Sequence, residues 1–145
     1  MKKRLLHLLL FIFFIGFVCV AFVIYDGYQM YREAISKISL SDKVQFVQKQ
    51  QHYTTLDQIS PYSINATVAV EDHRFFQHHG FDFAATANAF LYNLRTLSLA
   101  RGGSTITQQL AKNLYFTQEK KFSRKIAELF VAFYLEKKYS KNTIL

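Results

Sequence analysis

The chain has 145 residues, a net charge of +8 and one cysteine, and half of its residues are hydrophobic. This length suits one domain, and the hydrophobic and aromatic content excludes an intrinsically disordered chain. A single cysteine cannot form an intrachain disulfide, so stability must come from a packed core. The basic charge favours phosphates, anionic lipid headgroups or nucleic acid as binding partners.

The first predicted element is a charge-free run from Leu8 to Tyr25, LLLFIFFIGFVCVAFVIY. As a helix it would span about 27 Å, which matches the hydrocarbon core of a bilayer. Lys2, Lys3 and Arg4 precede it, and positive charge before a span favours a cytoplasmic N-terminus and an exported domain. A cleaved signal peptide is the alternative, but no small-x-small site follows the run, so we expect an uncleaved anchor. This topology argues against nucleic acid as a partner.

The chain is predicted to divide into four parts. These are a cytoplasmic tail (1–4), a transmembrane anchor (5–25), a stalk with the start of the domain (26–57) and the domain proper (58–145).

Helices account for all of the periodic segments in the predicted domain. Ser60-Pro61 has a serine at the N-cap and a proline at the first helical position, which predicts a helix that ends at Glu71. Further helices are predicted over 83–97, 105–113 and 122–138, and after Ser140, with Asp82 and Ser104 as additional caps. No segment shows sustained strand alternation, so the fold is predicted to be mainly α.

Glu128 is the only charge in the apolar segment IAELFVAFYL, residues 126–135. A helix of this kind is expected to bury part of the carboxylate, and an unpaired buried carboxylate is costly. Arg124 and Lys125 precede Glu128 by four and three residues, so both can reach it along one helical face. These residues fit a structural ion pair as well as a functional site, and the helix alone favours the ion pair.

The segment GGSTITQQLAKN, residues 102–113, combines two glycines with hydroxyl groups at a predicted helix start. Free backbone N–H groups at a helix N-terminus favour anions. Thr105, Gln109 and Lys112 recur at helical spacing and are expected to share one polar face. A solvated helix surface with an ordinary cap would have the same pattern. A Walker phosphate loop is excluded, because no lysine follows the glycines at the required place.

The segment EDHRFFQHHG, residues 71–80, has carboxylates and histidines at the end of an apolar run. His73 and His78 are five residues apart, which does not suit a zinc-binding helix. Glu71 ends the apolar run, so its carboxylate is expected to be partly dry and able to act in acid–base chemistry. A solvated charge at a helix end is the alternative. A carboxylate there opposes the helix dipole, which slightly favours a functional role.

Together these segments resemble the family 51 peptidoglycan glycosyltransferases. EDHRFFQHHG resembles the family's first motif, Glu-Asp-x-x-Phe-x-x-His-x-Gly, and GGSTITQQLAKN its second, Gly-x-Ser-Thr-Ile-Thr-Gln-Gln-Leu-x-Lys-Asn. RKIAE, residues 124–128, resembles the third, Arg-Lys-x-x-Glu. KNTIL, residues 141–145, begins the fourth, Lys-x-x-Ile-Leu-Glu-x-Tyr-Leu-Asn, and ends before its glutamate. The resemblance covers residues 60–145. We expect a C-terminally truncated member, either a monofunctional transglycosylase or the N-terminal part of a class A penicillin-binding protein.

The resemblance implies a lysozyme-like transglycosylase domain, here incomplete, behind one N-terminal transmembrane helix. It implies an inverting hexosyltransferase that polymerises lipid II into glycan strands and releases undecaprenyl pyrophosphate. By motif, Glu71 is the expected general base, and Glu128 is the second catalytic carboxylate, near the donor pyrophosphate. The expected substrate-binding residues are Asp72, Phe75, His78, Ser104, Thr105, Gln109, Lys112, Arg124 and Lys125.

The resemblance also implies cofactors, partners and a location. No organic cofactor is expected, and a divalent cation, Mg²⁺ or Mn²⁺, is a candidate at the pyrophosphate, with unknown ligands. Lipid II, the nascent glycan strand and the membrane are the expected partners, with other cell-wall synthesis proteins as candidates. We expect a single-pass protein of the bacterial cell membrane with its catalytic domain outside.

Two alternatives differ in class from this enzyme. One is an inert, membrane-anchored module left by truncation, which binds lipid II or other proteins without turnover. The other is a lysozyme-type glycoside hydrolase with two carboxylates. The hydrolase would leave the cations of Lys112, Arg124 and Lys125 unexplained.

Overall fold

The computed structural model describes residues 2–117 and 121–145, and within these ranges its regular elements are all helices. In chain order they are α1 (Lys2–Lys37), α2 (Leu40–Gln48), the 3₁₀ helix η1 (Leu56–Gln58), α3 (Pro61–Glu71), α4 (Phe83–Thr96), α5 (Ile106–Tyr115), α6 (Phe122–Lys138) and α7 (Lys141–Ile144). The prediction of a mainly α fold is confirmed.

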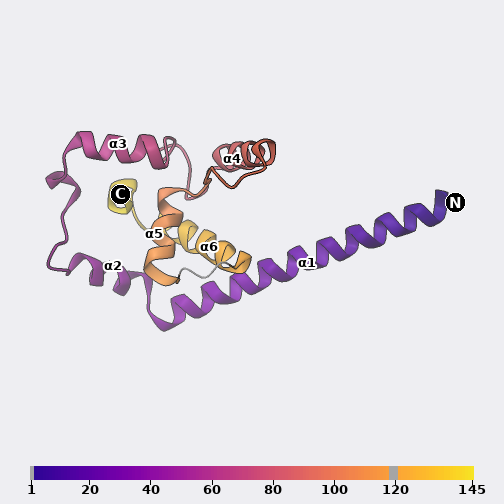
Figure 1. Cartoon of the computed structure of the whole chain (residues 1–145). Helices are drawn as coiled ribbons and strands as arrows, with labels where there is room; N and C mark the ends of the chain where they lie inside the picture. The colour runs from indigo at the N-terminus through magenta and orange to yellow at the C-terminus, as the bar shows by residue number, and fades with distance from the viewer. Residues whose placement is uncertain (1, 118–120) are drawn as a thin grey trace.

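Helix α1 has two halves with different surroundings. Figure 1 shows its N-terminal half projecting away from the other helices, and nearly all side chains of its apolar run are exposed. Among the described residues it is the one helix that is long and apolar enough to cross a membrane, so it is compatible with the predicted anchor. The C-terminal half continues without a break and packs against α6. Residues 26–57, predicted as a stalk and the start of the domain, therefore comprise the end of α1, all of α2, the beginning of η1 and the segments that join them.

The core lies around α6, which packs against α1, α5 and α7. Apolar residues recur along α6 at helical spacing, so that one face of it is continuously buried. The buried cluster consists of Leu40, Phe75, Ala111, Leu114, Val131, Ala132, Leu135 and Ile144. Each larger side chain in it contributes about 1.5–3 kcal/mol through removal of apolar surface from water.

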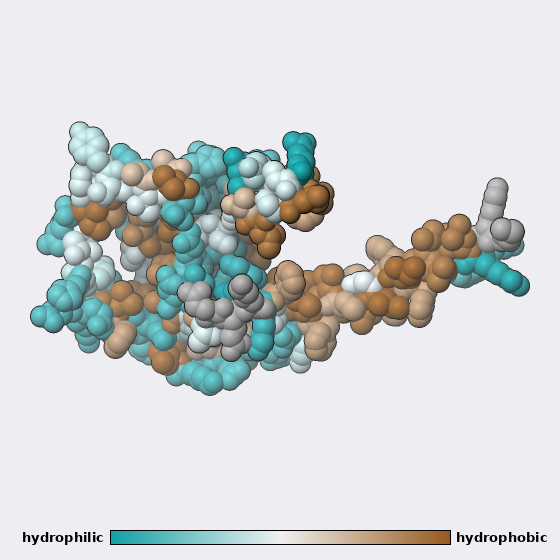
Figure 2. Space-filling model, in the orientation of Figure 1, coloured by the Kyte–Doolittle hydropathy of each residue, from teal (hydrophilic) through white to brown (hydrophobic). Residues whose placement is uncertain are grey.

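Helices α3 and α4 flank this core and leave much of their apolar surface exposed. Helix α3 begins at Pro61 as predicted, although among the described residues the Ser60 side chain makes no capping hydrogen bond. Helix α4 begins after Asp82, whose carboxylate accepts a 2.9 Å bond from the backbone N–H of Ala85, as predicted. Figure 2 shows hydrophobic residues along the projecting part of α1 and again at α4, on the side of the domain nearest to that projection.

Candidate active site

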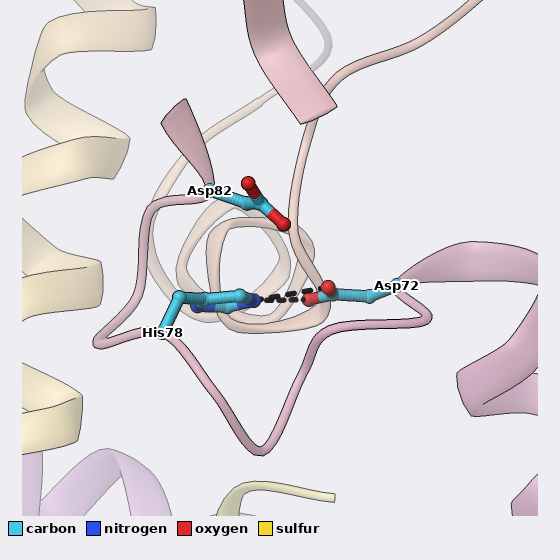
Figure 3. Close-up of side chains that lie close together, drawn as sticks. All are labelled: Asp72, His78 and Asp82. Carbon is cyan, nitrogen blue, oxygen red and sulfur yellow. Dashed lines mark hydrogen bonds and ion pairs between the residues drawn. The ribbon is translucent and has the colours of Figure 1, made fainter. Parts of the chain in front are cut away.

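The loop between α3 and α4 is held by the buried carboxylate of Asp72. This group accepts hydrogen bonds from Nε2 of His78 at 2.9 Å and from the backbone N–H of Ile106 at 3.0 Å. Figure 3 shows the side chains of Asp72 and His78 pointing toward one another across the loop. The carbonyl of Gly80 accepts a 2.8 Å bond from the hydroxyl of Thr105. The first motif is therefore fastened to the start of α5, which carries the second motif.

Asp82 lies in the same buried group as Asp72 and His78 (Figure 3), and one ligand-type atom from each lies within 4.8 Å of the other two. Sequence reasoning missed this group because it assigned Asp82 only to a helix cap. Such a trio can hold a metal ion, but Asp82 also pairs with Arg74 at 3.2 Å. The guanidinium of Arg74 already supplies the positive charge that a metal would bring. The group therefore fits a structural role, in which it holds the loop in place, better than it fits a metal site.

The carboxylate of Glu71 lies at the C-terminal end of α3 and is exposed. The prediction that this carboxylate is partly shielded from water is wrong. Helix α3 lies beside the core, and even the neighbouring Val70 is exposed. The amide of Gln109 donates a 2.8 Å hydrogen bond to Oε2 of Glu71. This contact joins the first motif to the second and leaves the carboxylate accessible to a substrate.

The start of α5 differs from the prediction. The sequence pattern predicts Ser104 as the cap and places Thr105 on a polar helical face, whereas in the structure Thr105 is the buried N-cap. Its hydroxyl accepts the backbone N–H of Gln108, and the Gln108 side chain accepts the N–H of Thr105 in return. Threonine followed three residues later by glutamine is a capping-box signal, and the sequence contained it. Of the three residues predicted to share a polar face, Gln109 and Lys112 remain on the surface, and both are half-buried.

Glu128 is the centre of a charged cluster at the start of α6, together with Arg124 and Lys125. Its side chain is fully buried, and its two oxygens bind different cations. Oε1 pairs with Arg124, and Oε2 pairs with Lys125 at 2.8 Å. Lys125 also donates to the hydroxyl of Ser104 at 3.1 Å. The predicted burial and pairing of Glu128 are confirmed.

Lys112 adds a third positive charge to this cluster from α5. Burial lowers the pKa of Lys125, and the charges of Arg124 and Lys112 lower it further. The ammonium of Lys112 is therefore near enough to Lys125 for their like charges to repel each other. Three cations around one carboxylate leave an excess of positive charge, which suits a multiply charged anion such as a phosphate.

Helix α5 brings the exposed carboxylate and the charged cluster to neighbouring positions. Gln109, which contacts Glu71, precedes Lys112 by three residues, or about 4.5 Å along the helix axis. Residues from α3, α5 and α6 thus converge on one region, with an acid–base group on one side and fixed positive charge on the other.

Phe75 and His78, predicted to shape a cleft, are buried, as is Asp72. These side chains contact other parts of the protein and hold the α3–α4 loop in place from its buried side. Substrate binding by these three residues stays a prediction.

Sequence reasoning missed a network that supports Phe75. The ammonium of Lys141 lies 4.3 Å from the centre of the Phe75 ring and 2.7 Å from Oε1 of Glu136. The hydroxyl of Thr107 donates to the same oxygen at 2.6 Å. The members come from α5, α6 and α7 and the α3–α4 loop, so no local pattern reveals their contact.

A divalent cation at the charged cluster does not suit the residues there. Mg²⁺ and Mn²⁺ take carboxylate and other oxygen ligands. Among the described residues the cluster contains one carboxylate, that of Glu128, and both of its oxygens already pair with cations. The donor set therefore does not fit such an ion.

Comparison with known proteins gives a consistent result. The family model described as Transglycosylase matches residues 38–145. A monofunctional glycosyltransferase of Staphylococcus haemolyticus is 37% identical over 144 residues, which are 99% of this chain and 50% of that protein. Those of Staphylococcus saprophyticus and Staphylococcus epidermidis are 41% and 40% identical, over 77% of this chain and 41% of each protein. The chain spans about half the length, or less, of these curated relatives.

Proposed function

Because the chain belongs to the transglycosylase family, we propose that it acts as a peptidoglycan glycosyltransferase that polymerises lipid II. One observation carries the proposal: α5 joins an exposed carboxylate, through Gln109, to a cationic cluster, through Lys112. A glycosyl transfer from a pyrophosphate donor needs both groups, one at the attacking hydroxyl and one at the leaving group.

Glu71 is the proposed general base. Its carboxylate accepts the proton of the 4-hydroxyl of the GlcNAc on an incoming lipid II, as that oxygen attacks the anomeric carbon of the growing strand. The new glycosidic bond forms on one face of the sugar while the bond to the pyrophosphate oxygen breaks on the other, with inversion. The exposure of Glu71 supports this role, since the base must reach a substrate. The amide of Gln109 limits the orientations of the carboxylate.

The cationic cluster is the proposed site of the leaving pyrophosphate. Lys112, Arg124 and Lys125 stabilise the negative charge that develops as the bond to the sugar breaks. Glu128 is fully buried and pairs with two of these cations, so it orients them. Fixed charges of this kind need no reorganisation during the reaction, which is why they lower its barrier.

The proposed location is the outer face of the bacterial cell membrane, with a single span and a cytoplasmic N-terminus. The basic residues that precede the apolar run support this orientation. A second apolar surface supports contact with lipid: Leu97 and Leu99 are 90% and 97% exposed, and Phe90 and Leu94 on α4 are also exposed. A site beside the bilayer suits a lipid-linked substrate.

The test is polymerisation of lipid II by the purified protein in liposomes. Glu71→Gln should lower the rate by about 100-fold or more, because it removes the base but keeps the size of the side chain and one oxygen that can accept from Gln109. Glu33→Gln is the matched control, since Glu33 is an exposed carboxylate paired only with Lys37 among the described residues. A wild-type rate in Glu71→Gln overturns the base assignment. Lipid II binding without polymer by the wild type would support the inert-module alternative instead.

A further inference from the structure

Helix α1 connects the apolar run to the domain without interruption. It extends over Lys2–Lys37, and it contains no proline, the residue that most often kinks a helix. Its C-terminal half packs against α6, the helix that carries the charged cluster. The position of α6 relative to the apolar run is therefore set by the contact between these two helices.

Gly27 is a point of very close approach between α1 and α6. A Cβ atom at this position would lie 2.5 Å from Cβ of Ile126 and 2.7 Å from the carbonyl oxygen of Ser123. Such distances are too short for any side chain, so the observed packing requires glycine. Gly16 lies in the same helix, and a Cβ atom there would meet nothing within 4 Å. The need for glycine is thus specific to position 27.

Aromatic rings hold the two helices together next to this contact. The ring of Phe130 on α6 lies 5.4 Å from the ring of Tyr28 and 5.7 Å from that of Tyr31, between ring centres. Aromatic pairs at this separation add about 0.5–1.5 kcal/mol beyond the area they bury. The glycine contact and the aromatic contacts together fix the position of α1 relative to α6.

The sequence gives the height of this contact relative to the bilayer. Gly27 lies two residues beyond Tyr25, where the charge-free run ends, which is about 3 Å along the helix axis. Its contacts on α6, Ser123 and Ile126, flank Arg124 and Lys125 in the chain. If α1 spans the bilayer, the charged start of α6 lies at the level of the lipid headgroups.

We propose that Gly27 is a positioning residue: its contact with α6 holds the cationic cluster at the height where a pyrophosphate carried by a membrane lipid must be bound. The inference rests on the proposed function, since it concerns how that site meets its substrate. A bulky side chain at position 27 would separate α1 from α6 and move the cluster away from this height. Inorganic pyrophosphate diffuses freely and can bind the cluster at any distance from the membrane. A pyrophosphate attached to a lipid is held at the membrane surface and cannot reach a displaced cluster.

The first experiment measures the position of α6 relative to the anchor. Spin labels are attached to Cys19, which is the native cysteine and is exposed, and to a second cysteine introduced as Lys137→Cys at the exposed end of α6. In liposomes, the distance between the labels should shift or broaden in Gly27→Leu and stay unchanged in Gly16→Leu. Both substitutions favour the helical state of α1, so loss of helix does not explain a change. An unchanged distance in Gly27→Leu overturns the inference.

The second experiment separates positioning from a general structural role. Binding of inorganic pyrophosphate and of undecaprenyl pyrophosphate, the latter in phosphatidylcholine vesicles, is measured for the wild type, Gly27→Ala, Gly27→Leu and Gly16→Leu. Gly27→Leu should weaken binding of the lipid-linked pyrophosphate by about tenfold and leave that of inorganic pyrophosphate within about twofold, with Gly27→Ala intermediate. Equal weakening of both ligands indicates damage to the cluster itself and overturns the inference. If the wild type binds neither ligand, the proposed function fails, whereas the label distances still decide whether Gly27 positions α6.

Discussion

Gln109 donates a 2.8 Å hydrogen bond to the carboxylate of Glu71, and this contact joins residues that are 38 positions apart in the chain. Glu71 is exposed and lies at the end of its helix, so its side chain would otherwise sample several rotamers. The amide selects the rotamer that points toward α5. The proposed role of Glu71 as the general base therefore depends on a residue from the second motif.

Removal of the Gln109 amide tests this dependence. Gln109→Ala should lower the rate of lipid II polymerisation about tenfold, because the base spends less time in the productive orientation. The melting temperature should change little, since one partly exposed hydrogen bond contributes only about 1 kcal/mol. Asn113→Ala, at an exposed position of the same helix, is the control and should keep the wild-type rate. A wild-type rate in Gln109→Ala would show that Glu71 needs no such orientation.

Because Gly80 lies in a left-handed backbone conformation, we expect its replacement by alanine to lower the stability of the protein. Gly80 has φ +85°, and a Cβ atom there would lie 3.2 Å from the backbone of Ala132. Gly80→Ala should lower the free energy of unfolding by about 1–2 kcal/mol from the backbone conformation alone. Gly102→Ala is the control, because a Cβ atom at Gly102 meets nothing within 4 Å. Denaturant unfolding in detergent measures both, and equal stability of the two variants would contradict the prediction.

Because the carboxylate of Asp72 is buried and accepts two hydrogen bonds, we expect its removal to lower the stability of the protein more than Gly80→Ala does. Asp72→Ala leaves Nε2 of His78 and the backbone N–H of Ile106 without their acceptor. One buried and one partly buried donor without acceptors should together lower the free energy of unfolding by about 2–4 kcal/mol. Asp57→Ala, at an exposed position, should stay within about 0.5 kcal/mol of the wild type. A similar small effect in Asp72→Ala would mean that the loop is held by other contacts.

The lowered pKa of Lys125 predicts an alkaline limit to phosphate binding. Burial, then the charges of Arg124 and Lys112, lower this pKa, so the ammonium loses its proton at a lower pH than an ordinary lysine. Binding of inorganic pyrophosphate, measured by calorimetry, should weaken as the pH rises through this pKa. Lys125→Arg stays charged and should extend binding to higher pH. Lys137→Arg, on the exposed end of α6, is the control and should leave the profile unchanged.

The sign of the linked stability effect distinguishes this loss of binding from unfolding. A lysine whose folded pKa is lowered binds fewer protons in the folded protein than in the unfolded chain. Between the lowered pKa and the ordinary lysine pKa, Lys125 therefore makes the folded state more stable as pH rises. The expected result is therefore weaker binding at higher pH without a fall in the melting temperature. Identical binding profiles for the wild type and Lys125→Arg would rule out titration of Lys125 as the cause.

Local patterns placed most helices correctly. The proline after Ser60, the carboxylate of Asp82 and the hydroxyl of Ser140 each mark a helix start that the structure contains. Glu128 was also predictable as a buried ion pair, because its cations lie on its own helix at fixed spacing. At the start of α5 the predicted cap, Ser104, is wrong. The adjacent Thr105 caps the helix instead, because it forms a capping box with Gln108.

Contacts between helices had no such local signal. The exposure of Glu71, the burial of Phe75 and the contact of Gln109 with Glu71 all depend on how α3 and its loop lie against α5 and α6. Gly27 is a further example: as a residue in a polar segment it carries no pattern, and its role follows from Ile126, far along the chain. The residue types and their periodicity specify helices and charges because these are short-range properties. Which side chains meet, and which remain open to a substrate, follows from packing, because packing alone brings distant segments within contact distance.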